Sequence, residues 1–372
     1  MERATFSTKN GRPDFESVVT QRVTPPGLHA FTPAASAANK RFIAVATRRA
    51  ESEFRHIELY DVVSNEFLDL TLPVSPNVHH FNPFFSPDAS WVGYHKCRGA
   101  TSDGKSNNFV LENVQSPVPG ISLFRIDGSF PSYSPDGERI AYVKFPGLYV
   151  MNSDGSGIRT VLTRTAFSTA WDWKRKGVVY TSVGPTFASE STKVDIISIN
   201  VDDEDLSYKK LTLGGENNAF PSASPDGKWV VFRSGRTGHK NLYIMDALNG
   251  EAGGLYRLTE GPWTDTMCNW SPDGEWIAFA SDRRTRVQLN QLQTLIITSP
   301  MVIYFVIKRW IWDTKIDPQL VRGCTPAWSP KFMSPANVEW PNGGSKCSFD
   351  DCHWLNISPD QGLSSSKRQC AH

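Results

Sequence analysis

The chain has 372 residues, with 39 Lys and Arg against 38 Asp and Glu, so its formal net charge at pH 7 is +1. No basic stripe or polybasic run accompanies this balance, which argues against a nucleic-acid binder, because such proteins gather cations along one face. The length allows one large repeat domain or two ordinary domains.

Residues 1–27 are predicted to form an N-terminal segment with one strand, around Glu16–Val23. The first residues, Met1–Phe6, lack the apolar stretch of a secretory leader, so no signal peptide is expected in this chain. The compartment is left open. Next, Phe31-Thr32-Pro33 precedes two short apolar runs, 41–45 and 56–61, which are typical of strands.

From residue 86 onward the chain repeats a short phrase. Ser-Pro-Asp begins at residues 86, 134, 224 and 271, and Trp171-Asp172-Trp173 stands where another copy is due. Taking Asp172 as that copy, the steps between anchors are 48, 38, 52 and 47 residues. This period fits four short strands with their turns and exceeds that of most helical repeats. The repeat therefore predicts an all-β fold, a β-propeller.

The copy at 218–259 shows how one blade is built. Four runs rich in aromatic and β-branched residues are separated by Gly-containing turns, which is typical of antiparallel hairpins. Ser-Pro-Asp-Gly sits at the first hairpin, where Pro presets the turn, Asp can bond the backbone beyond it, and Gly takes the left-handed position. Asp136, Asp226 and Asp273 are therefore interpreted as turn residues and not as catalytic acids.

Large aromatic side chains flank the phrase. We expect them to pack where neighbouring blades meet, because each blade must bury a face that it cannot bury alone. This explanation is preferred to a stacking platform for nucleic-acid bases because the rings follow the repeat. The preceding rings are Phe85, Tyr133, Trp171, Trp270 and Trp328, and the following rings are Trp91, Trp229 and Trp276.

The anchors, together with the worn copy at 28–61, predict about six four-stranded blades over residues 28–284. The N-terminal strand is available to complete the last blade and close the ring. Trp328-Ser329-Pro330 begins a further copy that lacks its following strands, so residues 324–372 are interpreted as a remnant blade and a C-terminal tail. A seven-bladed ring or an incomplete ring is the alternative, the latter if the chain is part of a longer protein.

Residues 285–323 depart from the repeat. Their apolar stretch, 292–307, is interrupted by Pro300 and is shorter than the about 20 residues of a spanning helix. Two buried strands on either side of Pro300 are favoured over a membrane span, and a segment alien to the fold is the third alternative. Further on, Cys347, Cys352 and His353 lack a second ligand pair, so a structural role or a local disulfide is favoured over a metal site.

The repeat resembles a known family. Ser-Pro-Asp-Gly, the strand Glu138–Tyr142 after it, and a closing Leu-Thr at 162, 211 and 258 are similar to the WD40-like repeat of the TolB propeller and to the N-terminal propeller of dipeptidyl peptidase IV. Residues 82–99 and 338–354 further resemble TolB-related proteins of plants. The resemblance covers 28–284 and 324–355. It implies a scaffold that holds a protein or peptide on its faces or in its central channel, with no common catalytic residue.

The sequence contains no GxSxG elbow, Gly-rich phosphate loop or HExxH motif. We therefore predict a monomeric, non-catalytic scaffold with a protein or peptide partner, no cofactor and no metal. The alternative is a metal-dependent enzyme, because oligogalacturonate lyases also resemble this repeat. It would use His79, His80 and His95 near the anchor at residue 86. Against it, adjacent residues of a strand point to opposite faces, which separates His79 from His80. A membrane-attached protein is the third hypothesis.

Overall fold

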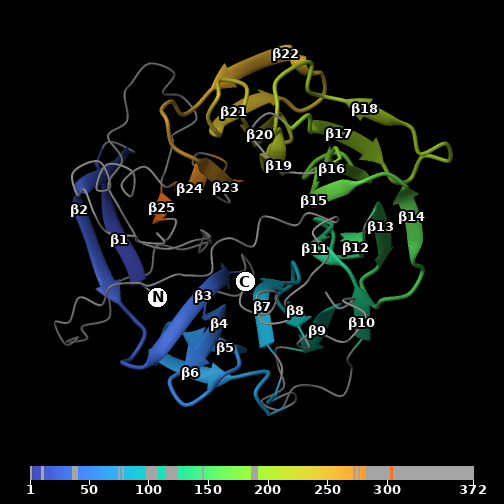
Figure 1. Ribbon diagram of the computed structural model, residues 1–372. Coiled ribbons are helices and arrows are strands. Elements are labelled where there is room, and N and C mark those ends of the chain that lie inside the picture. The colour runs from blue at the N-terminus through green and yellow to red at the C-terminus, as the bar shows by residue number, and fades with distance from the viewer. Residues whose placement is uncertain are drawn as a thin grey trace.

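The computed structural model describes residues 2–9, 12–35, 41–73, 76–77, 79–97, 108–113, 124–144, 146–185, 192–270, 274, 277–281 and 302–304. Within these ranges all regular structure is β-strand, and the antiparallel sheets are arranged around a ring with the first strand of each sheet innermost (Figure 1). The predicted all-β propeller is therefore confirmed.

Five sheets have four strands each in the described residues, paired in chain order. The first has β3 (Leu28–Ala35), β4 (Phe42–Arg49), β5 (His56–Asp61) and β6 (Glu66–Asp69). The second has β7 (His79–Phe85), β8 (Trp91–Cys97), β9 (Asn108–Asn113) and β10 (Phe124–Asp127). The third has β11 (Ser129–Tyr133), β12 (Arg139–Lys144), β13 (Gly147–Asn152) and β14 (Arg159–Leu162).

The fourth sheet has β15 (Ala166–Trp171), β16 (Val178–Val183), β17 (Asp195–Asn200) and β18 (Tyr208–Lys210). The fifth has β19 (Ala219–Ala223), β20 (Trp229–Ser234), β21 (Asn241–Asp246) and β22 (Gly250–Arg257). A sixth sheet joins β23 (Asp265–Trp270), β24 (Ile277–Ser281) and β25 (Val302–Tyr304). Because most residues after 281 lie outside the described ranges, the number of blades stays a prediction.

The N-terminal segment forms a hairpin. β1 (Glu2–Lys9) pairs antiparallel with β2 (Arg12–Arg22), and the two form a sheet of their own. The segment predicted to complete the last blade thus lies almost entirely in β2, whose partner in the described residues is β1. Closure of the ring by this strand stays a prediction.

Three residues of the atypical segment 285–323 belong to the sixth sheet. β25 pairs antiparallel with β24, with Val302 opposite Ser281 and Tyr304 opposite Phe279. The rest of that segment lies outside the described residues, as do Trp276, Trp328 and the group Cys347, Cys352 and His353. In the part of the chain that the structure describes, no helix is long and apolar enough to cross a membrane.

The repeated phrase closes the first hairpin of the third blade. Ser134 Oγ donates a hydrogen bond to Asp136 Oδ1 at 2.5 Å and accepts one from the Arg139 N–H at 3.0 Å. Asp136 Oδ1 also accepts the Glu138 N–H at 3.1 Å, and Gly137 is left-handed, with φ of 76°. The carboxylate is therefore used by its own turn, as predicted.

Two other copies repeat this geometry. Ser224 Oγ donates to Asp226 Oδ1 at 2.6 Å and accepts the Trp229 N–H at 2.9 Å. Likewise, Ser86 Oγ donates to Asp88 Oδ1 at 2.5 Å and accepts the N–H of Trp91. The phrase is thus a structural unit in which a hydroxyl links the two sides of the hairpin.

One copy carries alanine at the left-handed position, and this predicts a stabilising substitution. Ala89 has φ of 58°, where Gly137 and Gly227 have 76° and 70°. Replacing Ala89 with glycine is expected to raise the free energy of unfolding by about 0.5–1 kcal/mol, since glycine adopts this conformation without a Cβ penalty. Equilibrium urea denaturation measures the change.

The matched control is Gly137→Ala. A Cβ at Gly137 would lie 3.7 Å from the nearest Pro87 atoms, so there is room for it and only the backbone conformation is disfavoured. We expect this variant to lose about 1 kcal/mol. Equal signs for the two substitutions would contradict the strain argument.

The closing Leu-Thr of the blades has a structural cause. The threonine Oγ1 accepts a hydrogen bond from a backbone N–H near the start of the third strand of the blade. This bond holds the end of the fourth strand against the third strand. The pairs are Thr71 with Ile57 at 2.8 Å, Thr212 with Ile196 at 3.1 Å and Thr259 with Leu242 at 2.9 Å.

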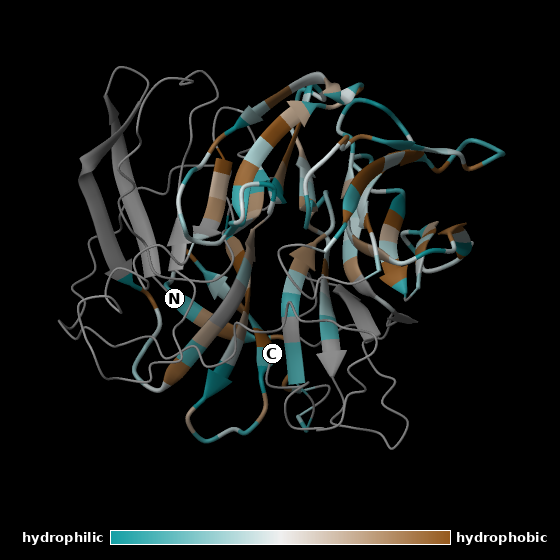
Figure 2. Ribbon diagram, turned by 45° about the horizontal axis from the view of Figure 1, so that its top comes forward, coloured by the Kyte–Doolittle hydropathy of each residue, from teal (hydrophilic) through white to brown (hydrophobic). Residues whose placement is uncertain are grey.

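The hydrophobic core lies between consecutive blades. Trp171 of β15 is 5% exposed and packs in one cluster with Val143 and Leu148 of the preceding blade, where its Nε1–H donates to the Ser132 carbonyl at 2.9 Å. Trp270 makes the equivalent bond to Ser222 at 3.0 Å. Figure 2 shows hydrophobic bands along the blade strands and hydrophilic segments at many of the turns. The predicted role at the blade contacts is thus confirmed for Trp171 and Trp270.

Candidate functional site

The inner edge of the ring carries a recurring distortion. In the described residues six innermost strands contain a register shift, and five of them hold a left-handed residue other than glycine four positions before the anchor of the repeat. Such a backbone costs on the order of 1 kcal/mol per residue, and bulges redirect side chains. We call these five the bulge residues: Asn82 (φ 50°), Phe130 (52°), Ser168 (61°), Phe220 (55°) and Met267 (53°).

The backbone carbonyls of two bulge residues accept hydrogen bonds from the next blade. The Phe130 carbonyl accepts a hydrogen bond from Thr169 Oγ1 at 2.6 Å, and the Phe220 carbonyl accepts one from Cys268 Sγ at 3.7 Å. Both donors directly follow the bulge residue of their own strand. Burial raises the pKa of Cys268 to about 12, so the thiol keeps its proton at neutral pH and can donate.

Two bulge residues meet across an intervening blade. The ring centroids of Phe130, from β11, and Phe220, from β19, are 6.5 Å apart, although β15 lies between those strands. The bulge residue of β15 is Ser168, whose small side chain is buried. Because all three strands are innermost in their blades (Figure 1), the two partly exposed rings meet at the inner edge of the fourth blade.

A buried cation supports this aromatic pair. The Arg233 guanidinium lies 4.9 Å from the centre of the Phe220 ring, and Arg233 is only 4% exposed. It donates to Asn217 Oδ1 and, at 3.4 Å, to Thr266 Oγ1 of β23. The guanidinium therefore packs against the Phe220 ring, and its hydrogen bond to Thr266 links the fifth sheet to the sixth.

The candidate metal ligands His79 and His80 have separate surroundings. His79 Nδ1 accepts the Arg55 N–H at 3.2 Å. His80 is fully buried, and its ring centroid lies 5.5 Å from that of His56 and 5.1 Å from that of Tyr94. The two adjacent side chains thus face different neighbours, in keeping with the alternation along a strand. No pattern in the sequence singled out His56.

The third candidate, His95, lies beside a bulge residue. Its Nδ1 is 3.0 Å from the side-chain nitrogen of Asn82, and burial lowers the pKa of His95 to about 4. In register it stands opposite Phe81 and not opposite either neighbouring histidine. Among the described residues, no three His, Cys, Asp or Glu side chains form a group that could hold a metal ion.

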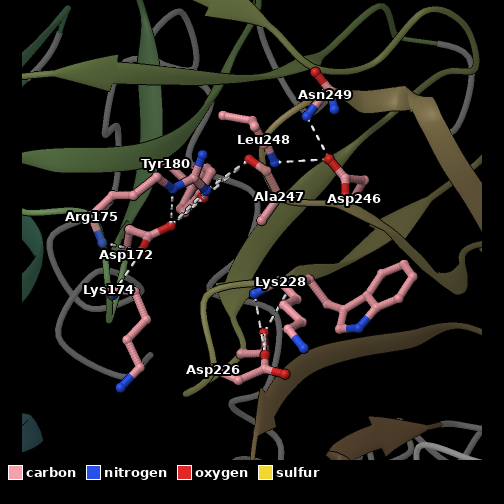
Figure 3. A network of polar contacts seen from close by, with 12 residues as sticks. Asp172, Lys174, Arg175, Tyr180, Asp226, Lys228, Asp246, Ala247, Leu248 and Asn249 are labelled. Atoms are coloured by element: carbon pink, nitrogen blue, oxygen red, sulfur yellow. Dashed lines mark hydrogen bonds and ion pairs between the residues drawn. The ribbon is translucent and has the colours of Figure 1, made fainter.

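Asp172, at the worn anchor, is the centre of a polar network (Figure 3). Its fully buried carboxylate accepts backbone N–H groups of Lys174 at 2.8 Å and Arg175 at 2.7 Å, the Arg175 guanidinium at 2.6 Å and the Tyr180 hydroxyl at 2.7 Å. The guanidinium also donates to the Ala247 carbonyl of the fifth blade at 2.9 Å. The network therefore joins two blades.

The electrostatics fit a structural role for Asp172. Burial by itself would raise the pKa of this carboxyl. The hydrogen bonds from Tyr180 and from the Arg175 and Lys174 N–H groups outweigh burial, so its pKa lies below the ordinary value. Burial and the hydrogen bond to the Asp172 carboxylate raise the pKa of Tyr180. Neither group is set up to exchange protons at neutral pH.

Comparison with known proteins agrees with this architecture. Residues 147–295 match the family model described as TolB beta propeller domain. The chain carries a TolB-related β-propeller. A TolB homologue from Chlorobium luteolum is 32% identical over 125 residues, which make up 32% of this chain and 27% of the relative. The match thus spans about a quarter of that relative's length.

Solved structures are also similar to this chain. A TolB from Agrobacterium tumefaciens is 23% identical, with 54% of this chain and 68% of that chain covered and a TM-score of 0.41. A prolyl endopeptidase is 12% identical, with 83% of this chain and 45% of that chain covered and a TM-score of 0.53. At 12% identity the similarity to the prolyl endopeptidase shows the fold alone.

Proposed function

We propose that this TolB-related propeller is a monomeric, non-catalytic scaffold that binds a protein or peptide partner at the centre of its ring. The observation that carries the proposal is the recurring bulge. It brings Asn, Phe, Ser, Phe and Met side chains, none of them ionisable, to equivalent positions on five inner strands. Aromatic and Met side chains are enriched where proteins bind one another.

The aromatic pair is the proposed anchor of this face. Phe130 and Phe220 are partly exposed, so they can contact a partner. Their backbones are bonded to the next blades, and Phe220 is also supported by Arg233. Groups that are already held in place lose little conformational entropy on binding, which favours affinity.

The test is a selection of random peptides on the purified protein. Selected peptides are expected to bind Phe220→Ala at least tenfold more weakly than the wild-type protein, because buried aromatic anchors carry about 2 kcal/mol or more of binding energy. Leu248→Ala is the control, since Leu248 is 59% exposed in the turn between β21 and β22. Thermal unfolding of both variants verifies folding. Equal binding by Phe220→Ala would refute the proposed site.

The alternative of a metal-dependent lyase makes a different prediction. It requires His79, His80 and His95 to act together, whereas each has its own contact in the structure. Elemental analysis of the purified protein and incubation with oligogalacturonate distinguish the two. Stoichiometric metal together with cleavage of the oligosaccharide would overturn the scaffold proposal.

A further inference from the structure

The five strands that carry the bulge residues contain no Asp, Glu, Lys, Arg or His between the bulge residue and the anchor. In the whole chain 21% of the residues are charged, so a charge would be expected several times over in this much sequence. We call these five segments the inner wall: Asn82–Phe85, Phe130–Tyr133, Ser168–Trp171, Phe220–Ala223 and Met267–Trp270.

Burial does not account for the missing charges. In β19, Phe220 and Ser222 are partly exposed while the residues on either side of each are buried. In β23, Met267 is partly exposed and Asn269 is exposed, again between buried neighbours. Because both strands are innermost in their blades, these side chains face the centre of the ring (Figure 1). Exposed positions ordinarily accept charged residues, and those of the inner wall have none.

The charged and titratable residues of the same five strands lie before the bulge. They are His79 and His80 in β7 and Asp265 in β23, and both His80 and Asp265 are fully buried. The Arg233 guanidinium packs against the Phe220 ring, but Arg233 is only 4% exposed and donates to neighbouring side chains. The inner wall therefore presents aromatic, aliphatic, hydroxyl and amide groups without a counter-charge for an ionised ligand.

We propose that the inner wall selects an uncharged segment of the protein or peptide partner and rejects segments that place an ionised side chain against it. This selectivity depends on the proposed function, whose binding site it specifies further. An ionised side chain that leaves water for such a wall loses hydration and meets no counter-charge, whereas an apolar side chain gains free energy. Rejection of unsuitable ligands is a common source of specificity. An acidic oligosaccharide belongs to the rejected class.

Charge scanning of selected peptides is the first test. Peptides that bind the wild-type protein but not Phe220→Ala are substituted at each position with Asp or Lys, and with Asn or Met as neutral controls. Each peptide is expected to contain a run of positions where both charges weaken binding at least tenfold and the neutral residues less than threefold. Raising the salt from about 50 to about 500 mM should change the affinity of the parent peptide less than twofold, because no ion pair contributes.

A charge swap is the decisive test. Ser222→Asp places a carboxylate on the inner wall, so a peptide weakened by Lys is expected to regain at least fivefold in affinity on this variant, while its Asp counterpart gains nothing. Ser207→Asp is the matched control, since Ser207 is exposed in the turn before β18, away from the wall, and should behave as the wild-type protein. If Ser222→Asp does not fold, Asn269→Asp introduces the same charge at an exposed position of β23.

The outcomes separate this selectivity from the binding site itself. Peptides that depend on Phe220 but tolerate Asp or Lys at every position would overturn the selectivity and leave the site in place. Tighter binding of the Asp peptides would overturn it as well, and would assign an attractive role to Arg233. Failure of both wall carboxylates to restore Lys peptides contradicts the role of the wall. If no selected peptide depends on Phe220, the proposed function and the selectivity fail together.

Discussion

Replacing Asp172 with alanine is expected to lower the free energy of unfolding by about 3 kcal/mol. The substitution removes the acceptor of two backbone N–H groups, a tyrosine hydroxyl and a guanidinium, all within 2.9 Å of the carboxylate. Removing one partner of a buried ion pair costs about 3–5 kcal/mol, and the 30% exposure of the Arg175 side chain places the effect at the lower end. Urea denaturation provides the measurement.

The matched control is Asp226→Ala. Asp226 occupies the turn of the next blade, accepts hydrogen bonds from Ser224 and from the Lys228 N–H, and is less buried than Asp172. We expect a loss of about 1 kcal/mol there, the usual net value of such bonds. The excess at Asp172 should shrink as the pH falls below about 4, because a carboxyl with a lowered pKa stabilises the fold only while ionised. Equal losses at neutral pH would contradict the assigned role of the network.

Trp171→Ala is expected to cost a similar or larger amount, about 3–5 kcal/mol, because it opens a cavity between the third and fourth blades. The ring is 5% exposed, packs among residues of both blades, and lies 5.2 Å from the Arg139 guanidinium. Its Nε1–H bond to the Ser132 carbonyl is lost as well. Thermal or urea denaturation measures the effect.

The turn that follows β15 supplies the control. Trp173 follows Trp171 by two residues and is 54% exposed, so Trp173→Ala should change the free energy of unfolding by less than about 0.5 kcal/mol. Trp171→Phe keeps most of the packing and should lose an intermediate amount. If truncation of Trp173 destabilised the protein as much as truncation of Trp171, the buried blade contact would not be the cause.

Sequence reasoning succeeded where structure depends on local chemistry. The phrase Ser134-Pro-Asp-Gly137 could be interpreted from the needs of a hairpin turn, and Asp172 could be placed at a worn anchor by spacing alone. The same spacing predicted that Trp171 and Trp270 pack between blades. Each of these conclusions needs only a turn preference, a period and the requirement to bury large rings.

It failed where a position is defined by backbone shape or by distant partners. The bulge residues share a conformation but no residue type, since Asn82, Phe130, Ser168, Phe220 and Met267 have different side chains. Aligning the repeats on their anchors would give the position of these residues, because each lies four residues before its anchor. Their residue types alone do not identify them. Likewise, His80 was grouped with its neighbour His79, whereas the fold pairs it with His56, 24 residues earlier. Partner strands, such as β1 for β2, also depend on long-range pairing.

The tryptophan bonds between blades run in one direction. Trp171 and Trp270 each reach from the innermost strand of a later blade to a carbonyl on the innermost strand of the blade before it. The first strand of a blade therefore bonds directly to the preceding blade, and this bond does not depend on the outer strands. A chain that emerges in order can therefore add blades one at a time, each bonded to its predecessor as its first strand arrives. Changes in the later strands of a blade leave a bond of this kind, such as that between β23 and β19, in place.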